Sequence, residues 1–314
     1  HKMKPEVNRR IVDVIIPVYK PEKDFYKLVE RLEKQTVPIR HIHIMHTVDG
    51  MDLSELAGKY ENLLLTEVQP EKFDHGGTRD QAARMSDADI LVFFTQDALP
   101  KGRDLIENLI KPLENDRTAV SFARQLPRED CAIIERYVRK FNYPEKSRIK
   151  SEEDLQELGI KTFFSSNVCA AYNRRIYLKV GGFEKQTILN EDMLFAARCI
   201  KQGYSVSYTA EAKVIHSHNY THLQQFRRNF DVAVSQAQHP EIFSGIKSEK
   251  EGIRLVKSGA AYLLRTGRPF KVVSLFWGSA VKYAGFFMGK HYRSLPKRLV
   301  LCCTMFPAYW KRVM

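Results

Sequence analysis

The first half of the chain alternates short apolar runs with polar stretches in which apolar residues recur at helical spacing. The apolar runs have the length of buried strands and occupy residues 12–19, 41–48, 63–68, 90–95 and 119–123. The stretches with helical spacing occupy residues 22–35, 77–85 and 104–113. Strands that alternate with helices are typical of an α/β protein with a parallel sheet. The pattern therefore predicts an α/β domain built on such a sheet.

The pattern is less regular in the middle of the chain and then becomes helical. A stretch rich in Lys and Glu, residues 144–159, predicts a loop and a short helix beginning near Ser151, where Ser151 and Asp154 resemble a capping box. We then expect, in order, a strand at 163–172, a helix at 191–202, a strand at 204–216 and a helix at 223–236. Several amphipathic segments follow, with breaks at residues 267–269, 289 and 296.

We divide the chain into three parts on this pattern. Residues 1–10 form an N-terminal tail or an added remnant, residues 11–230 the α/β domain, and residues 231–314 a helical region. The 314 residues are 44% hydrophobic and 28% charged, which is the composition of a folded globular protein. Five cysteines without zinc-site spacing favour neither a disulfide framework nor structural zinc, so a reducing, cytoplasmic compartment fits best. The first ten residues hold no apolar run of signal-peptide length, and we do not expect secretion.

The net charge of +13 is concentrated at the C-terminal end. Residues 241–314 contain 14 Lys or Arg and three Glu, and no acidic residue follows Glu251. Aromatic residues such as Trp277, Phe287 and Trp310 are interleaved with these bases, a combination that suits an anionic membrane surface. The uncharged run over residues 272–281 is shorter than the roughly 20 residues of a spanning helix. We expect this region to lie on a membrane; the alternative is that its helices only pack on the α/β domain.

Chemically useful residues follow several of the predicted strands. In chain order they are Pro17 and Tyr19, Asp49, Gly76, Gly77 and Arg79, and Thr95, Gln96 and Asp97. Ligands of open α/β sheets bind at the carboxyl ends of the strands. The glycine turn with Arg79 suits a diphosphate, although a tight turn with a surface ion pair is an alternative. Asp97 suits Mg²⁺ or Mn²⁺, although an Asp in this place also serves as a helix cap.

A set of short motifs, taken in order, resembles the inverting glycosyltransferases of family 2. The motifs are Ile15-Ile16-Pro17-Val18-Tyr19, Asp49-Gly50, Gly77-x-Arg79-Asp80, Gln96-Asp97, Val180-Gly181-Gly182-Phe183, Glu191-Asp192, Gly203-Tyr204 and Val214-Ile215-His216. The resemblance implies a GT-A fold, a Rossmann-like mixed sheet flanked by helices, with the basic amphipathic helices as a C-terminal appendage. The segments around Gly77, Asp97, Asn167 and Asp192 are more narrowly similar to bacterial rhamnosyltransferases that build cell-wall or O-antigen polysaccharides.

The resemblance also implies roles for individual residues. Asp97 matches the last Asp of the family's metal motif, and His216 and then His218 are candidates to complete the metal site. Metal dependence is expected, although this sequence departs from the family's pattern in carrying Thr95 where relatives usually have another Asp. Asp192 matches the catalytic base, which Glu191 would help to position. Outside the metal and base sites, the donor would be bound by Pro17, Tyr19, Asp49, Gly76, Gly77, Arg79, Thr95 and Gln96. The sugar or acceptor pocket would be lined by Ser166 and Asn167.

The implied activity is transfer of L-rhamnose from dTDP-β-L-rhamnose to a lipid-linked saccharide, with Mg²⁺ or Mn²⁺, at the cytoplasmic face of the membrane. A UDP-hexose donor on the same fold is one alternative. A non-catalytic protein that binds polysaccharide or nucleic acid is another, although no nucleic-acid recognition motif is present and no nucleic-acid partner is expected. The sequence does not determine the oligomeric state, and a homodimer is one possibility.

Overall fold

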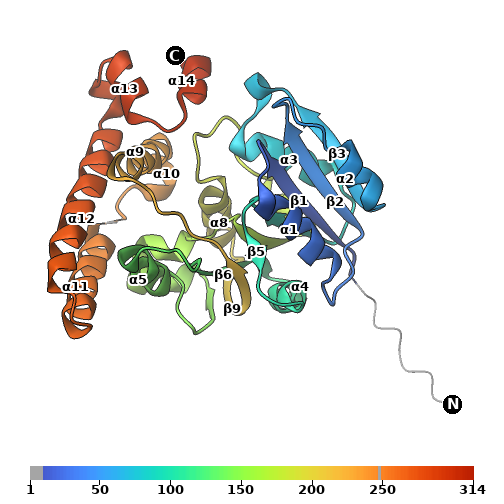
Figure 1. Ribbon diagram of the computed structural model, residues 1–314, viewed down its shortest axis with the longest axis horizontal. Helices are drawn as coiled ribbons and strands as arrows, with labels where there is room; N and C mark the ends of the chain where they lie inside the picture. Colours follow the sequence, from blue (N-terminus) through green and yellow to red (C-terminus); the bar gives the residue numbers. More distant parts are fainter. Residues whose placement is uncertain (1–9, 247–248) are drawn as a thin grey trace.

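The computed structural model describes residues 10–246 and 249–314, so the expected N-terminal tail lies almost entirely outside the described residues. A nine-stranded sheet forms the centre, with the order β3-β2-β1-β4-β8-β6-β9-β5 and β7 paired to β9 (Figure 1). The strands are β1 (Val12–Val18), β2 (His41–Thr47), β3 (Leu63–Val68), β4 (Ile90–Phe94), β5 (Leu99–Pro100), β6 (Thr118–Leu126), β7 (Arg148–Lys150), β8 (Cys169–Asn173) and β9 (Ser205–Ile215).

Fourteen α-helices accompany the sheet in the described residues. They are α1 (Lys23–Glu33), α2 (Ser54–Lys59), α3 (His75–Met85), α4 (Leu105–Ile110), α5 (Ile133–Asn142), α6 (Leu155–Leu158), α7 (Arg174–Val180), α8 (Glu191–Lys201), α9 (His222–Gln238), α10 (Pro240–Phe243), α11 (Glu249–Arg265), α12 (Pro269–Lys290), α13 (Lys297–Cys303) and α14 (Pro307–Val313). The capping box expected at Ser151 is present, with Asp154 as its partner, and it opens a short 3₁₀ turn.

The sheet is mixed and contains both parallel and antiparallel pairs, with β6 and β9 parallel to each other. Strands β3, β2, β1 and β4 run parallel to one another. Strand β8 is antiparallel to both of its neighbours, β4 and β6. The strand predicted over 163–172 is confirmed only from Cys169 onward, because residues 159–163 form a 3₁₀ helix. A run of apolar residues cannot by itself tell a strand from another buried segment.

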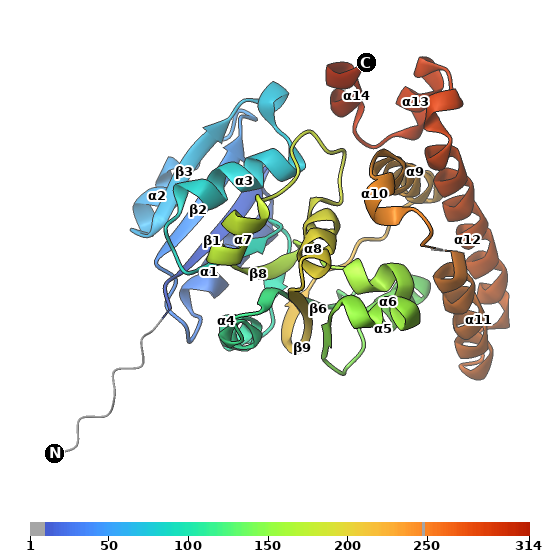
Figure 2. The same ribbon diagram turned by 180° about the vertical axis from the view of Figure 1, so that it is seen from behind.

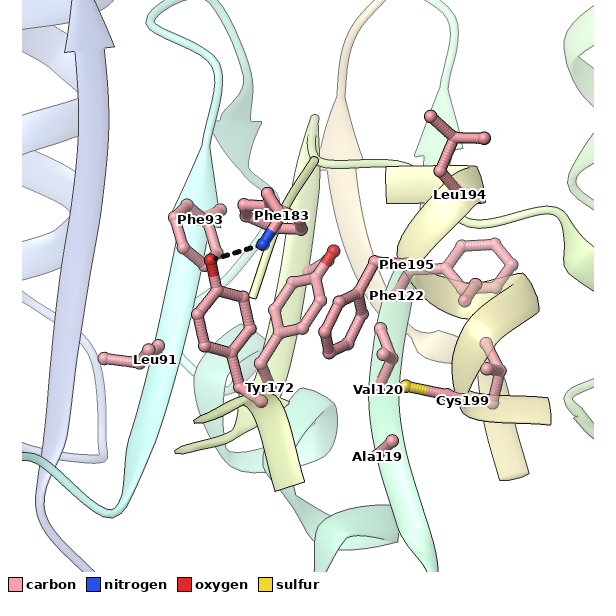
Figure 3. Close-up of a cluster of buried hydrophobic side chains, with 14 of the residues drawn as sticks. Leu91, Phe93, Ala119, Val120, Phe122, Tyr172, Phe183, Leu194, Phe195 and Cys199 are labelled. Atoms are coloured by element: carbon pink, nitrogen blue, oxygen red, sulfur yellow. Dashed lines mark hydrogen bonds between the residues drawn. The ribbon is translucent and has the colours of Figure 1, made fainter. Parts of the chain in front are cut away.

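Alternation along the strands gives the sheet two apolar faces. Ile90, Val92 and Phe94 of β4 belong to the core beneath α1 and α4, whereas Leu91 and Phe93 belong to the core beneath α3, α7 and α8 (Figure 2). On the second face Phe93, Tyr172, Phe183 and Phe195 pack edge to face (Figure 3). This packing fixes α8, whose first residues are Glu191 and Asp192.

The C-terminal helices form a second body beside the sheet, in which α12 packs on α9 and α11 packs on α12 and α5 (Figures 1 and 2). Gly285 and Gly289 of α12 lie against the backbone carbonyls of Phe226 and Phe230 of α9, where a Cβ would overlap them. Helix α9 runs across residue 230, so the boundary expected there falls inside a helix. None of the helices in the described residues is long and apolar enough to cross a membrane.

The chain end returns to the half of the molecule that contains the sheet. Val300, Tyr309 and Trp310 form a small core with Ile188, which lies in the loop before α8. The Arg312 guanidinium donates to the carbonyl oxygen of Phe73, just ahead of α3. The C-terminal segment therefore buttresses the loop that leads into Glu191 and Asp192.

Candidate active site

Asp97, His216 and His218 come together at the carboxyl end of β4 and the end of β9. The ligand atoms that the three side chains offer all lie within 4.8 Å of one another. His218 Nε2 is 3.2 Å from Asp97 Oδ2, and His216 Nε2 is 3.5 Å from Asp97 Oδ1. One carboxylate and two imidazoles form a donor set that divalent metals such as Mn²⁺ accept. The residues present therefore fit the metal that the sequence leads us to expect.

The electrostatics of this cluster favour its metal-binding protonation states. Burial raises the pKa of Asp97, but hydrogen bonds with His216 and His218 outweigh burial and hold that pKa below its ordinary value. Burial lowers the pKa of His216 more than the neighbouring carboxylate raises it. The cluster thus offers an ionised carboxylate and a neutral imidazole, which are the forms that bind metals.

Two further residues hold the cluster in place. Arg128 donates from Nη2 to the carbonyl oxygen of Asp97 at 2.7 Å and from Nη1 to Asp24 of α1 at 2.6 Å. Its backbone N–H donates to Ser217 Oγ, between the two histidines. The other residue, Gln125 of β6, faces His216 Nδ1 through its Oε1 at 3.0 Å. Neither residue was identified from the sequence, because a long-range contact of an Arg or a Gln leaves no local pattern.

Asp192 begins α8 beside the loop that carries Asn167. Its Oδ2 accepts the backbone N–H of Asn167 at 2.8 Å, and its Oδ1 accepts the N–H of Met193 at 2.8 Å. Burial and then the nearby charge of Glu191 raise the pKa of Asp192 to about 7. Asp192 as a residue is half-buried, in contrast to the buried Glu191 beside it. A rigid carboxylate that titrates near neutral pH is suited to general base work.

Glu191 is buried and serves as an anchor. Its Oε1 is 3.2 Å from both Arg79 Nη1 and Asn167 Nδ2. Asn167 Oδ1 in turn accepts the hydroxyl of Tyr172 at 2.6 Å. Burial raises the pKa of Glu191, but the charges of Arg79 and His75 and the hydrogen bond from Asn167 together outweigh burial and keep that pKa below its ordinary value. Glu191 is thus the ionised member of the pair, and it holds Asp192 and Asn167 in register.

The glycine turn has a different neighbour from the one that its sequence suggests. A Cβ on Gly76 would overlap the carbonyl oxygen of Glu184, and the N–H of Gly77 donates to the N-cap Asp74 at 2.7 Å. Arg79 is 6% exposed and ion-paired with Glu191. The space next to the glycines, where a diphosphate was expected, is thus occupied by the loop that precedes Asp192. This arrangement fits the alternative of a tight turn with an ion pair. The ion pair is buried, however, and not at the surface.

The remaining donor-side candidates line the ends of β1, β2 and β4. Gln96 exchanges two hydrogen bonds of 2.9 Å with the backbone of Tyr19, next to the strand that contains Pro17. The Asp49 carboxylate is buried and holds the loops, accepting from the N–H of Lys20 at 2.6 Å and of Met51 at 2.9 Å. The Thr95 hydroxyl is buried without a protein hydrogen-bond partner.

One hydrogen bond joins the two halves of the site. The N–H of Thr95 donates to the carbonyl oxygen of Val168 at 3.1 Å, where β4 and β8 pair. Asp97 is therefore two residues from this bond on one side, and Ser166 and Asn167 are one or two residues from it on the other. The structure brings the metal candidates and the Glu191–Asp192 pair to the same edge of the sheet.

Comparison with known proteins shows the family of the chain. Residues 13–181, more than half of the chain, match the family model described as glycosyl transferase family 2. The chain is 37% identical over 306 residues to the O-antigen chain rhamnosyltransferase RfbN of Salmonella typhimurium, covering 96% of each chain. It is 38% identical over 285 residues to the O-antigen chain rhamnosyltransferase WbaN of Salmonella anatum, covering 90% of this chain and 89% of that one.

Solved structures share the fold at low sequence identity. A mannosyltransferase from Pyrobaculum calidifontis, in complex with GDP-Man and Mn²⁺, superposes with a TM-score of 0.57 at 16% identity, covering 97% of this chain and 86% of the other. TarS 1–349 of S. aureus with UDP-GlcNAc gives a TM-score of 0.52 at 14% identity, covering 90% and 92%. The chain belongs to glycosyl transferase family 2 and is a glycosyltransferase with a GT-A fold.

Proposed function

We propose that the protein transfers L-rhamnose from dTDP-β-L-rhamnose to a lipid-linked saccharide in the synthesis of O-antigen or a similar surface polysaccharide, with inversion at the anomeric carbon. The observation that carries the proposal is the assembly of Asp97, His216, His218 and Asp192 at one sheet edge, in a chain that aligns over 96% of its length with an O-antigen chain rhamnosyltransferase. The linkage formed from a β donor is then α.

Asp192 is the base in this proposal. The acceptor hydroxyl gives its proton to the Asp192 carboxylate while its oxygen attacks the anomeric carbon, and the bond from that carbon to the diphosphate breaks. Each Asp192 oxygen accepts one backbone N–H, and a carboxylate oxygen has two acceptor positions, so one stays free for the acceptor. Glu191 and Asn167 keep the Asp192 carboxylate in place. Ser166 directly precedes Asn167 in the same loop.

Departure of the dTDP needs positive charge near its phosphates. Asp97, His216 and His218 would hold Mg²⁺ or Mn²⁺, which when bound supplies that charge. Arg128 keeps the Asp97 loop against the histidine-bearing segment. Gln96 and Tyr19 close the neighbouring loop over the end of β1, where the nucleoside is expected.

A calorimetric screen of nucleotide sugars with and without Mn²⁺ tests the donor and the metal together. We expect tight binding of dTDP-β-L-rhamnose that weakens when Mn²⁺ is left out. Preference for a UDP-hexose would keep the enzyme class and replace the donor. Absence of binding to any nucleotide sugar, with salt-sensitive binding of DNA, would support the nucleic-acid alternative instead.

The outer face of α12 supports docking on an anionic membrane. At helical spacing it exposes Val273, Phe276, Trp277, Tyr283 and Phe287, each more than half exposed. This outward face bears no charged side chain between Lys271 and Lys290, and α12 lies at the edge of the molecule on the side away from the sheet (Figures 1 and 2).

The charges around this face match a bilayer with anionic lipids. The two ends of the apolar face carry basic residues, namely Arg265, Arg268, Lys271, Lys290 and Arg293. No acidic residue follows Glu251. A face of large aromatic residues bordered by bases is the arrangement of an interfacial helix. We place the enzyme at the cytoplasmic face of the membrane, where a lipid-linked acceptor would be presented.

A further inference from the structure

Gln125 lies at the centre of a hydrogen-bond network between the two halves of the candidate active site. It belongs to β6 and is 3% exposed. Its Nε2 donates to the Tyr143 hydroxyl at 2.7 Å and to Ser166 Oγ at 3.0 Å. Its Oε1 accepts from Arg139 Nη1 at 2.5 Å and is 3.0 Å from His216 Nδ1. All four hydrogen-bonding positions of the amide are therefore used.

The contact with Arg139 settles which end of the amide faces His216. A guanidinium only donates, so the amide atom it touches is the oxygen. An amide oxygen only accepts, so His216 Nδ1 must carry a hydrogen. A neutral His216 then has its lone pair on Nε2, the atom that faces Asp97. A metal needs that lone pair, and the partner of the other ring nitrogen decides where it lies.

The donor end of the same amide reaches the acceptor side. Ser166 directly precedes Asn167, whose N–H holds Asp192. A single buried side chain therefore contacts both a metal candidate and the loop that supports the base. We propose that Gln125 is a positioning residue that fixes the His216 ring as an Nε2 ligand of the metal. The inference rests on the metal site of the proposed function and adds the residue that orients one of its ligands.

The test is the affinity of the full chain for Mn²⁺ alone, measured by electron paramagnetic resonance, with thermal unfolding to confirm the fold. Gln125→Leu removes the acceptor for His216 Nδ1–H and is expected to weaken Mn²⁺ binding by about 10-fold to 100-fold. Gln125→Asn, which keeps an amide but is one methylene shorter, should weaken it in the same direction and serves if the Leu variant does not fold.

Gln125→Glu is the rescue variant. A carboxylate accepts from both Arg139 and His216 Nδ1, while Tyr143 and Ser166 can reverse their hydroxyls and donate. Mn²⁺ affinity at least equal to that of the wild type is expected. Ser121→Ala is the matched control, since Ser121 is buried on the same strand and its Oγ hydrogen-bonds to Thr209 Oγ1, which is outside the four contacts of the Gln125 amide. It should leave Mn²⁺ affinity unchanged.

Each outcome bears on the inference. Weaker binding in the Leu or Asn variant with recovery in the Glu variant supports it. Wild-type affinity in a folded Leu variant, or an equal loss in Ser121→Ala, overturns the role of Gln125 while leaving the metal site intact. A wild-type protein that binds no Mn²⁺ overturns the metal site itself, and the role of Gln125 falls with it.

Discussion

Asp192 is the residue on which the proposed chemistry depends, and its replacement by Asn keeps the shape of the side chain but removes its ability to take a proton. We expect Asp192→Asn to reduce transfer by about 10²-fold to 10⁴-fold. Donor and Mn²⁺ binding should remain, because Asp97, His216 and His218 are untouched. Rates and calorimetric donor affinity, measured on the same preparation, check both parts.

Asp231→Asn is the matched control for this substitution. Asp231 is a buried carboxyl on α9 that accepts hydrogen bonds from Thr304 Oγ1 at 2.6 Å and the N–H of Met305 at 2.8 Å. Its replacement should leave the rate close to that of the wild type once folding is confirmed. Near wild-type transfer by a folded Asp192→Asn protein would remove Asp192 from the role of base and leave Glu191 as the next candidate.

The raised pKa of Asp192 also predicts how the rate depends on pH. The base must be ionised, and burial followed by the charge of Glu191 raises its pKa to about 7. We therefore expect kcat/KM to rise with pH up to about 7 and then to level off. Burial also raises the pKa of Asp231 to about 7, so the Asp231→Asn profile must keep this limb. A profile that is flat down to about pH 5 would indicate a carboxylate with an ordinary pKa.

The sequence located the candidate chemistry by type but not the contacts that organise it. Asp97 was found because it follows a readable strand, whereas Asp192 was identified through the resemblance of its motif to family 2 glycosyltransferases. Arg79 was expected at a diphosphate and is instead buried against Glu191, 112 residues along the chain. Gln125 went unnoticed because the predicted strand ended at residue 123, whereas β6 continues to Leu126. Partners far apart in the chain leave no local signal.

Helix α12 packs on α9 through glycines, and this contact can be tested with two matched substitutions. A Cβ at Gly285 would overlap the carbonyl oxygen of Phe226, so Gly285→Ala should destabilise the protein by about 1–3 kcal/mol. At Gly278 of the same helix the nearest neighbour of a Cβ is a His222 carbon 3.9 Å away. Gly278→Ala should therefore stabilise by up to about 1 kcal/mol through helix propensity.

Denaturant unfolding of the two variants measures the difference directly. Opposite signs support the close contact between α12 and α9. Equal effects of the two substitutions on the free energy of unfolding would contradict the close contact between Gly285 and the Phe226 carbonyl oxygen.

The opposite face of α12 predicts membrane binding. The double substitution Phe276→Glu and Trp277→Glu removes two large apolar side chains and adds two negative charges at an exposed site. We expect binding to vesicles that contain anionic lipid to fall by more than about 10-fold, or roughly 1.4 kcal/mol. The melting temperature should change little, because both residues are more than half exposed.

Ile149→Glu changes an equally exposed apolar residue on β7 and is the control. It should retain more of the vesicle binding than the double variant. Unchanged vesicle binding by the double variant would contradict the membrane assignment. A wild-type dimer that becomes monomeric in the double variant would show that a second copy of the chain covers this face.

At the level of elements, hydrophobic periodicity predicted most of the sheet and both long C-terminal helices. It missed α5, whose residues were not singled out, and it read 163–172 as one strand. It also left open whether the C-terminal helices pack on the body or lie on a membrane. Because α12 is apolar on both sides, periodicity could not tell which face meets α9; the glycines at 285 and 289 mark the packed one.

Across the whole molecule, the C-terminal region has two connected roles. Its inner residues, including Val300 and Trp310, pack with Ile188 and support the loop into α8. Its outer face is the proposed site of membrane contact. The proposed base, its supporting loop and the helix proposed to face the membrane therefore belong to one continuous packed unit. If the helix binds a bilayer as proposed, this packing would hold the active site in a constant position relative to it.

The most direct test of the account is the product formed from dTDP-β-L-rhamnose and a lipid-linked saccharide extracted from bacterial membranes. With Mn²⁺ present, the account predicts a saccharide extended by rhamnose in an α linkage, identified by mass spectrometry and by NMR of the anomeric proton, and little product from Asp192→Asn. A β-linked product would contradict inversion. Transfer of a different sugar in preference to rhamnose would contradict the assignment of the donor.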